Sequence, residues 1–112
     1  MEELRKLAGE IIAFRDARNW EQFHNPKDLA MALSIESAEL MELFLWKSKE
    51  ELKDVPVEKV REELADILIY CLLIADRYDF DVIDIMKKKL SRNEQKYPVD
   101  KARGNARKYN EY

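Results

Sequence analysis

Two pairs of acidic residues lie where the helical pattern calls for apolar side chains. Glu36 and Glu39 are three residues apart in one segment, and Glu63 and Asp66 repeat that spacing in another. At about 100° per residue, each pair falls on the apolar side of its helix. Residues three apart are neighbours on a helix surface, so each pair places two carboxylates on one turn. Facing each other across a bundle, the two pairs would form a cage of four carboxylates.

Such a cage requires compensating positive charge. A buried, unpaired carboxylate costs several kcal/mol, whereas a whole domain is stable by only about 5–15 kcal/mol. Lys59 and Arg77 could supply salt bridges near Asp66, and either acidic pair taken alone could be a solvated helix face. A divalent cation compensates four acids better, because all-oxygen ligation suits Mg²⁺, with Mn²⁺ as a substitute. We therefore predict a magnesium site that the phosphates of a bound ligand would complete.

Other metals lack the ligands that they prefer. Zinc is disfavoured because His24 is the sole histidine and Cys71 the sole cysteine. A di-iron bundle requires Glu-x-x-His on two helices, and that alternative fails on residue count. Cys71 lies within the longest apolar run, Ile67–Ala75, and has no second thiol to pair with. It is therefore expected to be a small buried hydrophobic residue.

A second unusual polar group lies near the C-terminal end. Asn93 falls on the apolar stripe of its predicted helix, and Lys89 and Lys96 border that stripe. An amide flanked by two ammonium groups would suit the anionic oxygens of a phosphate chain. The alternative is an asparagine bonded to a helix neighbour, with both lysines in solvent.

Aromatic residues gather in one predicted loop and at one helix end. Trp20, Phe23 and His24 lie in the loop, and Trp46 lies at the end of the second helix. Together they could form a flat slot for a nucleobase. The alternative is ordinary core packing, which is common for aromatic residues near helix ends.

Helices must position these groups, since the chain has two Gly, three Pro and 38% charged residues. We predict an all-α fold, a bundle of four helices plus one short turn. The turn signals place them, in chain order, at about Glu2–Asn19, Pro26 to Trp46 or Lys47, a capping-box turn from Ser48, Pro56–Arg77, and from the Asp79–Asp81 corner to about Tyr97.

Length and charge limit the organisation further. With 112 residues the chain should be a single domain, residues 1–112, in which residues 98–112 form a basic C-terminal arm that is either solvated or ordered by a partner. The net charge of −3 argues against binding to nucleic acid. A signal peptide is not evident and the longest apolar run is half a membrane span, so we expect a cytoplasmic protein without a membrane partner.

The two central helices are apolar on more than one side. In the second helix, Leu29 and Leu33 lie on one face and Met31 and Ile35 on the opposite one. The third helix shows a similar distribution. A helix that is apolar all round is normally covered all round, so the second face should pack on another subunit. We expect a homodimer or a homotetramer.

Five segments together resemble the all-α nucleoside triphosphate pyrophosphohydrolases of the MazG-like superfamily, and most closely the dCTP pyrophosphatase branch. They are residues 18–24, 36–47, 62–70, 93–98 and 102–109. Ile35 precedes Glu36 where typical MazG proteins have a second glutamate. Ile11 stands where the dCTP pyrophosphatase branch can place a histidine that contacts the base.

The resemblance implies a function and a set of site residues. Carboxylates at the positions of Glu36, Glu39, Glu63 and Asp66 hold Mg²⁺ in the family and make up its catalytic site. Water attacks at the α–β linkage and releases a nucleoside monophosphate and pyrophosphate. Members form dimers, or dimers of dimers, with sites between subunits. In the dCTP pyrophosphatase branch, the positions of Trp20, Phe23, His24, Trp46 and Tyr70 contact the nucleotide. Apart from the resemblance, we expect a second group of residues to hold the phosphates in line: Lys89, Asn93, Lys96 and Arg103.

We therefore expect a magnesium-dependent pyrophosphohydrolase that acts on (d)NTP, including dCTP or modified nucleotides, and so cleans the nucleotide pool. Two alternatives belong to other classes of protein. One is a non-enzymatic helical oligomer whose acids meet basic residues of a partner. The other is a nucleotide-binding regulator that has the carboxylate cage but no turnover.

Overall fold

Helices make up the regular structure in the computed structural model, which describes residues 2–111. This confirms the expected all-α fold. The chain forms two compact units, Met1–Asp79 and Phe80–Tyr112. The first contains α1 (Glu2–Ala17), η1 (Glu21–Phe23), α2 (Pro26–Glu42), η2 (Glu50–Asp54) and α3 (Val57–Tyr78). The second contains α4 (Val82–Lys96), α5 (Val99–Ala102) and η3 (Tyr109–Glu111).

Side-chain caps fix where several of these elements begin. The Asn25 side chain accepts a hydrogen bond from the Asp28 amide at 2.9 Å, just ahead of Pro26 in the first turn of α2. Ser48 and Glu51 exchange two hydrogen bonds of 3.3 Å, each between the side chain of one and the backbone amide of the other. This is the predicted capping box, and it leads into the short 3-10 helix η2.

The second helix ends earlier than the sequence pattern predicts. Regular α-helix stops at Glu42, and the amides of Leu43, Phe44 and Leu45 then donate to carbonyls three residues back, at 3.0–3.2 Å. Such bonds tighten the last turn into 3-10 geometry. Trp46 follows with a positive φ of 62°, a backbone region that bulky residues seldom adopt. Apolar spacing continues to Trp46, whereas the helix does not.

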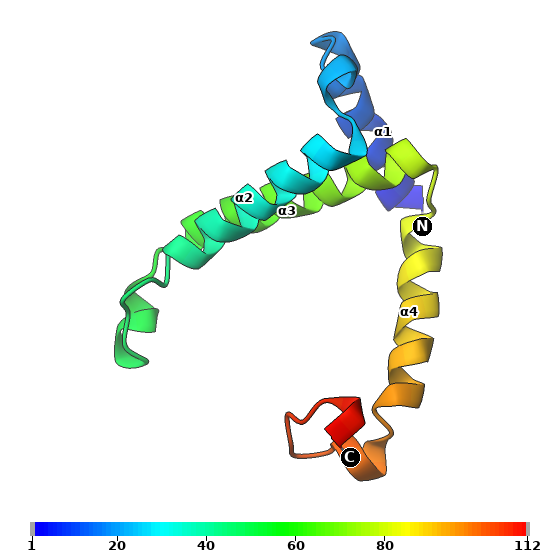
Figure 1. The fold of residues 1–112 in the computed structure, drawn as a ribbon. Helices are drawn as coiled ribbons and strands as arrows, with labels where there is room; N and C mark the ends of the chain where they lie inside the picture. Colours follow the sequence, from blue (N-terminus) through cyan, green and yellow to red (C-terminus); the bar gives the residue numbers. More distant parts are fainter. Residues whose placement is uncertain (1, 112) are drawn as a thin grey trace. The chain divides into compact units, whose positions relative to one another are not determined.

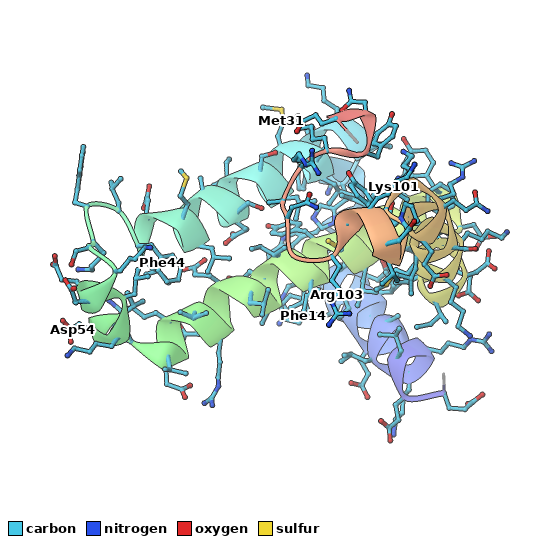
Figure 2. All side chains as sticks on the ribbon, turned by 90° about the horizontal axis from the view of Figure 1, so that it is seen from below. Phe14, Met31, Phe44, Asp54, Lys101 and Arg103 are labelled. Atoms are coloured by element: carbon cyan, nitrogen blue, oxygen red, sulfur yellow. The ribbon has the colours of Figure 1, made fainter. Side chains whose placement is uncertain are left out.

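In the first unit, α2 and α3 run antiparallel and side by side, and α1 packs against α3 (Figure 1). Phe44 and Asp54 lie at the end of the hairpin where the two helices are connected (Figure 2). Among residues 2–111, the buried apolar core is small. It consists of Leu29, Val55, Leu73 and Ala75.

Many apolar side chains of α2 and α3 remain exposed. Met31 and Ile35 on α2 are 54% and 58% exposed, and Leu64 and Leu68 on α3 are 47% and 55% exposed. Cys71 is exposed as well, so the expectation that it is buried was wrong. The apolar run around Cys71 indicated a core position, but α3 carries apolar residues on a face that α1 and α2 do not cover.

The second unit holds the C-terminal arm by its aromatic residues. The Tyr97 and Tyr109 rings meet edge to face with centroids 6.1 Å apart, and the Lys96 ammonium lies 4.9 Å from the centre of the Tyr109 ring. Part of the arm forms the short helix α5. Within residues 2–111, none of the helices combines the length and the apolar character that crossing a membrane requires.

Candidate active site

Three of the four predicted carboxylates converge between α2 and α3. Glu36, Glu39 and Glu63 each offer one oxygen, and these oxygens lie within 4.8 Å of one another. We call these three residues the carboxylate cluster. The Oε2 atoms of Glu36 and Glu63 are buried and have no hydrogen-bond partner. Two orphaned buried acceptors on facing helices are costly unless a ligand satisfies them.

The pKa values of the cluster reflect the closeness of its negative charges. Burial, together with the neighbouring acids Glu39, Asp66 and Glu63, raises the pKa of Glu36 from 4.5 to about 7. Burial and Glu39 also raise the pKa of Glu63. The fourth predicted carboxylate, Asp66, thus acts on the cluster through its charge. Burial and the negative charges of Glu36, Asp66 and Glu39 raise the pKa of Tyr70.

This arrangement fits a hard divalent cation. The donors are carboxylate oxygens alone, two of them lack any other partner, and adjacent negative charges destabilise one another without a cation. Binding of a cation would lower the pKa values of the cluster and supply the two missing contacts. The residues present can therefore hold a metal ion.

Beside Asp66 and Tyr70 lies a pocket of about 260 Å³, which we call the aromatic pocket. Its walls are contributed by α1, the loop that follows it, and α3. The lining residues are Ile11, Phe14, Arg15, Trp20, His24, Asp66, Ile69, Tyr70 and Leu73. An apolar wall with a few polar groups is typical of a site for a small organic ligand.

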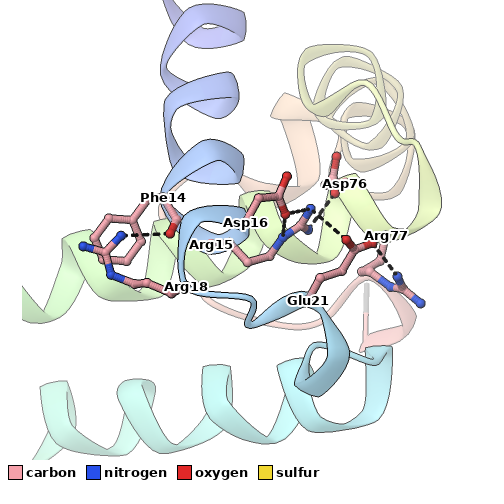
Figure 3. A network of polar contacts seen from close by, with 7 residues as sticks. All are labelled: Phe14, Arg15, Asp16, Arg18, Glu21, Asp76 and Arg77. Atoms are coloured by element: carbon pink, nitrogen blue, oxygen red, sulfur yellow. Dashed lines mark hydrogen bonds and ion pairs between the residues drawn. The ribbon is translucent and has the colours of Figure 1, made fainter.

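Aromatic stacking shapes one wall of the aromatic pocket. The Phe14 and Trp20 rings meet edge to face with centroids 5.8 Å apart. The Arg18 guanidinium lies 3.6 Å from the centre of the Phe14 ring and donates a hydrogen bond of 2.9 Å to the Phe14 carbonyl (Figure 3). Arg18 thereby covers one face of the Phe14 ring.

His24 supplies a polar group to the same pocket. Its Nδ1 is buried and has no hydrogen-bond partner. Burial, together with the positive charge of Arg15, lowers the pKa of His24. The neutral imidazole is therefore favoured, and its Nδ1 has an unused capacity for a hydrogen bond.

Apart from the carboxylate cluster, the predicted site residues divide into three groups. Trp20, His24 and Tyr70 line the aromatic pocket with Asp66, whereas Phe23 is 62% exposed and does not line it. Trp46 lies beyond the end of α2 and is 91% exposed. The remaining four residues belong to the second unit: Lys89, Asn93, Lys96 and Arg103.

Phe14 and Arg15 are among the residues of the pocket wall that the predicted site did not include. Arg15 is 4% exposed although it carries a full positive charge. The signal was present, because Arg15 lies four residues after Ile11 and seven after Ala8, on the apolar stripe of α1. A search for charged residues on the apolar side of a helix, which identified the four acids, would have identified Arg15 as well.

Comparison with known proteins defines the family. A sequence model of the MazG-like family matches residues 31–112, and the chain belongs to this family. A crystal structure of a pyrophosphatase from Archaeoglobus fulgidus has a TM-score of 0.81 and 41% identity, covering 86% of this chain and 93% of that one. The family resemblance and fold class expected from the sequence are thereby confirmed.

Two mammalian relatives are both called dCTP pyrophosphatase 1. The mouse protein (Mus musculus) is 43% identical over 114 residues, which cover 97% of this chain and 65% of the relative. The human protein (Homo sapiens) is 40% identical over 116 residues, which cover 99% of this chain and 66% of the relative. The chain thus spans just under two thirds of the length of these relatives.

Proposed function

We propose that this protein is a magnesium-dependent nucleoside triphosphate pyrophosphohydrolase. Its substrates would be (d)NTPs, including dCTP or modified nucleotides. Water adds across the α–β anhydride linkage, and the products are a nucleoside monophosphate, pyrophosphate and a proton. The observation that carries the proposal is the position of the carboxylate cluster, with two orphaned buried oxygens, close to a pocket that is lined by aromatic side chains. The names of the relatives favour the same reaction.

Each group of residues has a role in this proposal. Glu36, Glu39, Glu63 and Asp66 hold Mg²⁺, which when bound neutralises charge that develops on the phosphates. Trp20, His24 and Tyr70 receive the nucleoside in the aromatic pocket. Phe23 and Trp46 contact it from outside the pocket walls, and Trp46 is suited to this by its exposure. The phosphate chain is held by residues of the second unit: Lys89, Asn93, Lys96 and Arg103.

Product identification tests the proposed reaction. The purified protein is incubated with Mg²⁺ and each of a panel of standard and modified nucleoside triphosphates, and the products are separated by ion-exchange chromatography. We expect equal amounts of nucleoside monophosphate and pyrophosphate, with no turnover in the presence of a chelator. Release of orthophosphate and nucleoside diphosphate would contradict the assignment.

We also propose that the protein is a homodimer or a homotetramer. The exposed apolar residues Met31, Ile35, Leu64 and Leu68 lie on the two helices that carry the carboxylate cluster. An apolar surface of this kind is favourably buried against a second copy of the same helices. The copy would then cover the side of the site that α1 leaves open.

Light scattering during gel filtration measures the oligomeric state. The wild-type protein should have a molar mass of two or four times 13.4 kDa. Leu68→Lys places a charge in the apolar surface and should shift the mass towards 13.4 kDa. Glu58→Lys on the same helix is the matched control, because the Glu58 side chain is 75% exposed. A wild-type mass of one chain would contradict the proposal.

A further inference from the structure

Arg15 is the centre of an ion-pair network that the proposed chemistry does not use. Its Nη1 donates to Asp76 Oδ2 at 2.9 Å, and its Nε donates to Asp16 Oδ1 at 3.0 Å. Its Nη2 lies 3.8 Å from Glu21 Oε2. The Arg15 side chain is 5% exposed, whereas its three acidic partners are 42–56% exposed. A single buried cation thus gathers three acids that still reach water (Figure 3).

The network connects the elements that form the aromatic pocket. Arg15 belongs to α1, Glu21 to the loop helix η1, and Asp76 to α3. Arg77, also on α3, makes a second contact with Glu21 at 3.6 Å. The loop is therefore held at one point by two cations. Without these ion pairs, the Glu21 carboxylate would be more stable in water than against α3, which would favour movement of the loop away from α3.

The backbone of Arg15 strengthens this arrangement. Its carbonyl accepts hydrogen bonds from the amides of Arg18 and Trp20, both at 3.2 Å. The loop continues with bonds from Phe23 to the Trp20 carbonyl at 2.9 Å and from His24 to the Glu21 carbonyl at 3.0 Å. Main-chain bonds thus connect Trp20 to Arg15 and His24 to Glu21. The ion pairs connect Glu21 to Arg15 and Arg77.

We propose that Arg15 is a positioning residue that holds the loop of residues 20–24 as a wall of the aromatic pocket. It thereby sets the affinity for the nucleotide without contacting the reacting phosphates. The effect on nucleotide affinity rests on the proposed function, whereas the effect on the conformation of the loop does not. We expect Arg15→Ala to fold, because the acids that it leaves behind are partly solvated and the carboxylate cluster lies elsewhere on α2 and α3.

Amide hydrogen exchange tests the positioning role without any assay of activity. In Arg15→Ala, the amides of Trp20, Phe23 and His24 should exchange about tenfold faster or more, since a charged hydrogen bond is lost. The Leu64 amide, which lies on α3 outside the aromatic pocket, should keep its wild-type protection. Asp76→Asn is the milder second variant and should give the same pattern with a smaller change. Arg61→Ala, on an exposed arginine of α3, is the matched control.

Kinetics then separate positioning from general destabilisation. We expect Arg15→Ala to raise KM for the nucleotide about tenfold, with kcat changed by less than about twofold. The affinity of the metal site for Mn²⁺ alone should be unchanged. Loop amides that exchange at the wild-type rate would overturn the proposal, and so would faster exchange throughout α3. If the wild-type protein hydrolyses no nucleotide, the proposed function fails, while the exchange result still decides the role of Arg15.

Discussion

Glu63→Gln is expected to abolish magnesium-dependent hydrolysis while the helices stay folded. The substitution keeps the size of the side chain but removes one negative charge from a cluster whose oxygens lie within 4.8 Å of one another. Loss of one group that stabilises the transition state typically costs about 10²–10³ in kcat, and loss of a metal ligand should cost at least as much. Steady-state kinetics with excess Mg²⁺ measure the effect.

The neighbouring residue provides the control for this substitution. Glu62→Gln makes the same chemical change one position earlier on α3, at an exposed side chain outside the cluster, and should leave kcat within about twofold of wild type. Circular dichroism and light scattering show whether each variant keeps its helices and its molar mass. Asp66→Asn extends the comparison to the fourth predicted carboxylate.

The same variants separate the competing functions. If Glu63→Gln and Asp66→Asn dissociate the subunits instead of stopping turnover, the acids form salt bridges in an interface, and the protein is a structural oligomer. If the wild-type protein binds Mg²⁺ and nucleotide but releases no product, it is a nucleotide-binding regulator. Loss of turnover with retained assembly supports the enzyme.

Metal-free protein is expected to lose thermal stability as the pH rises from about 5 to about 7. The folded protein holds a proton on Glu36 up to about pH 7, whereas the unfolded chain releases it near its ordinary value of 4.5. The folded state therefore binds more protons than the unfolded state between these values, and stability falls as pH rises. The pKa of Glu63 is raised too, which acts in the same direction.

Saturating Mg²⁺ should reverse this dependence, because the ion binds the deprotonated cluster and stabilises the folded state most where the acids have lost their protons. Thermal unfolding in a chelator and in Mg²⁺, followed across this pH range, measures both slopes. Glu36→Gln should flatten the slope in the chelator. A Tm that rises between pH 5 and pH 7 in the absence of metal would show that Glu36 is not held protonated in the folded protein.

The helical pattern predicted the four long helices and all three residues of the carboxylate cluster. Helical spacing determines which residues share a face, so the apolar neighbours of Glu36 and Glu63 indicated that both side chains point inwards. The caps at Asn25 and Ser48 were equally local, since each one involves residues at most three positions apart. Features of this kind depend on residues within one helical turn and can therefore be predicted from the local sequence.

Other features depend on contacts that spacing does not reveal. Cys71 was expected in the core because its neighbours are apolar, but the apolar pattern does not say which face of α3 the same chain covers. The end of α2 depends on a change from α to 3-10 bonding, for which the sequence of Leu43 to Leu45 carries no signal. The pairing of Arg15 with Asp76 joins residues 61 positions apart and follows only from the tertiary fold.

That separation of 61 residues also predicts an order for the events of folding. The α2–α3 hairpin closes a short connection, whereas the contact between Arg15 and Asp76 must close a ring that contains the whole hairpin. Longer loops are entropically more costly to close, so we expect the contact between Arg15 and Asp76 to form after the hairpin. The carboxylate cluster should therefore assemble before the aromatic pocket. On partial unfolding the order reverses, and the pocket should open while the acids on the hairpin are still close together.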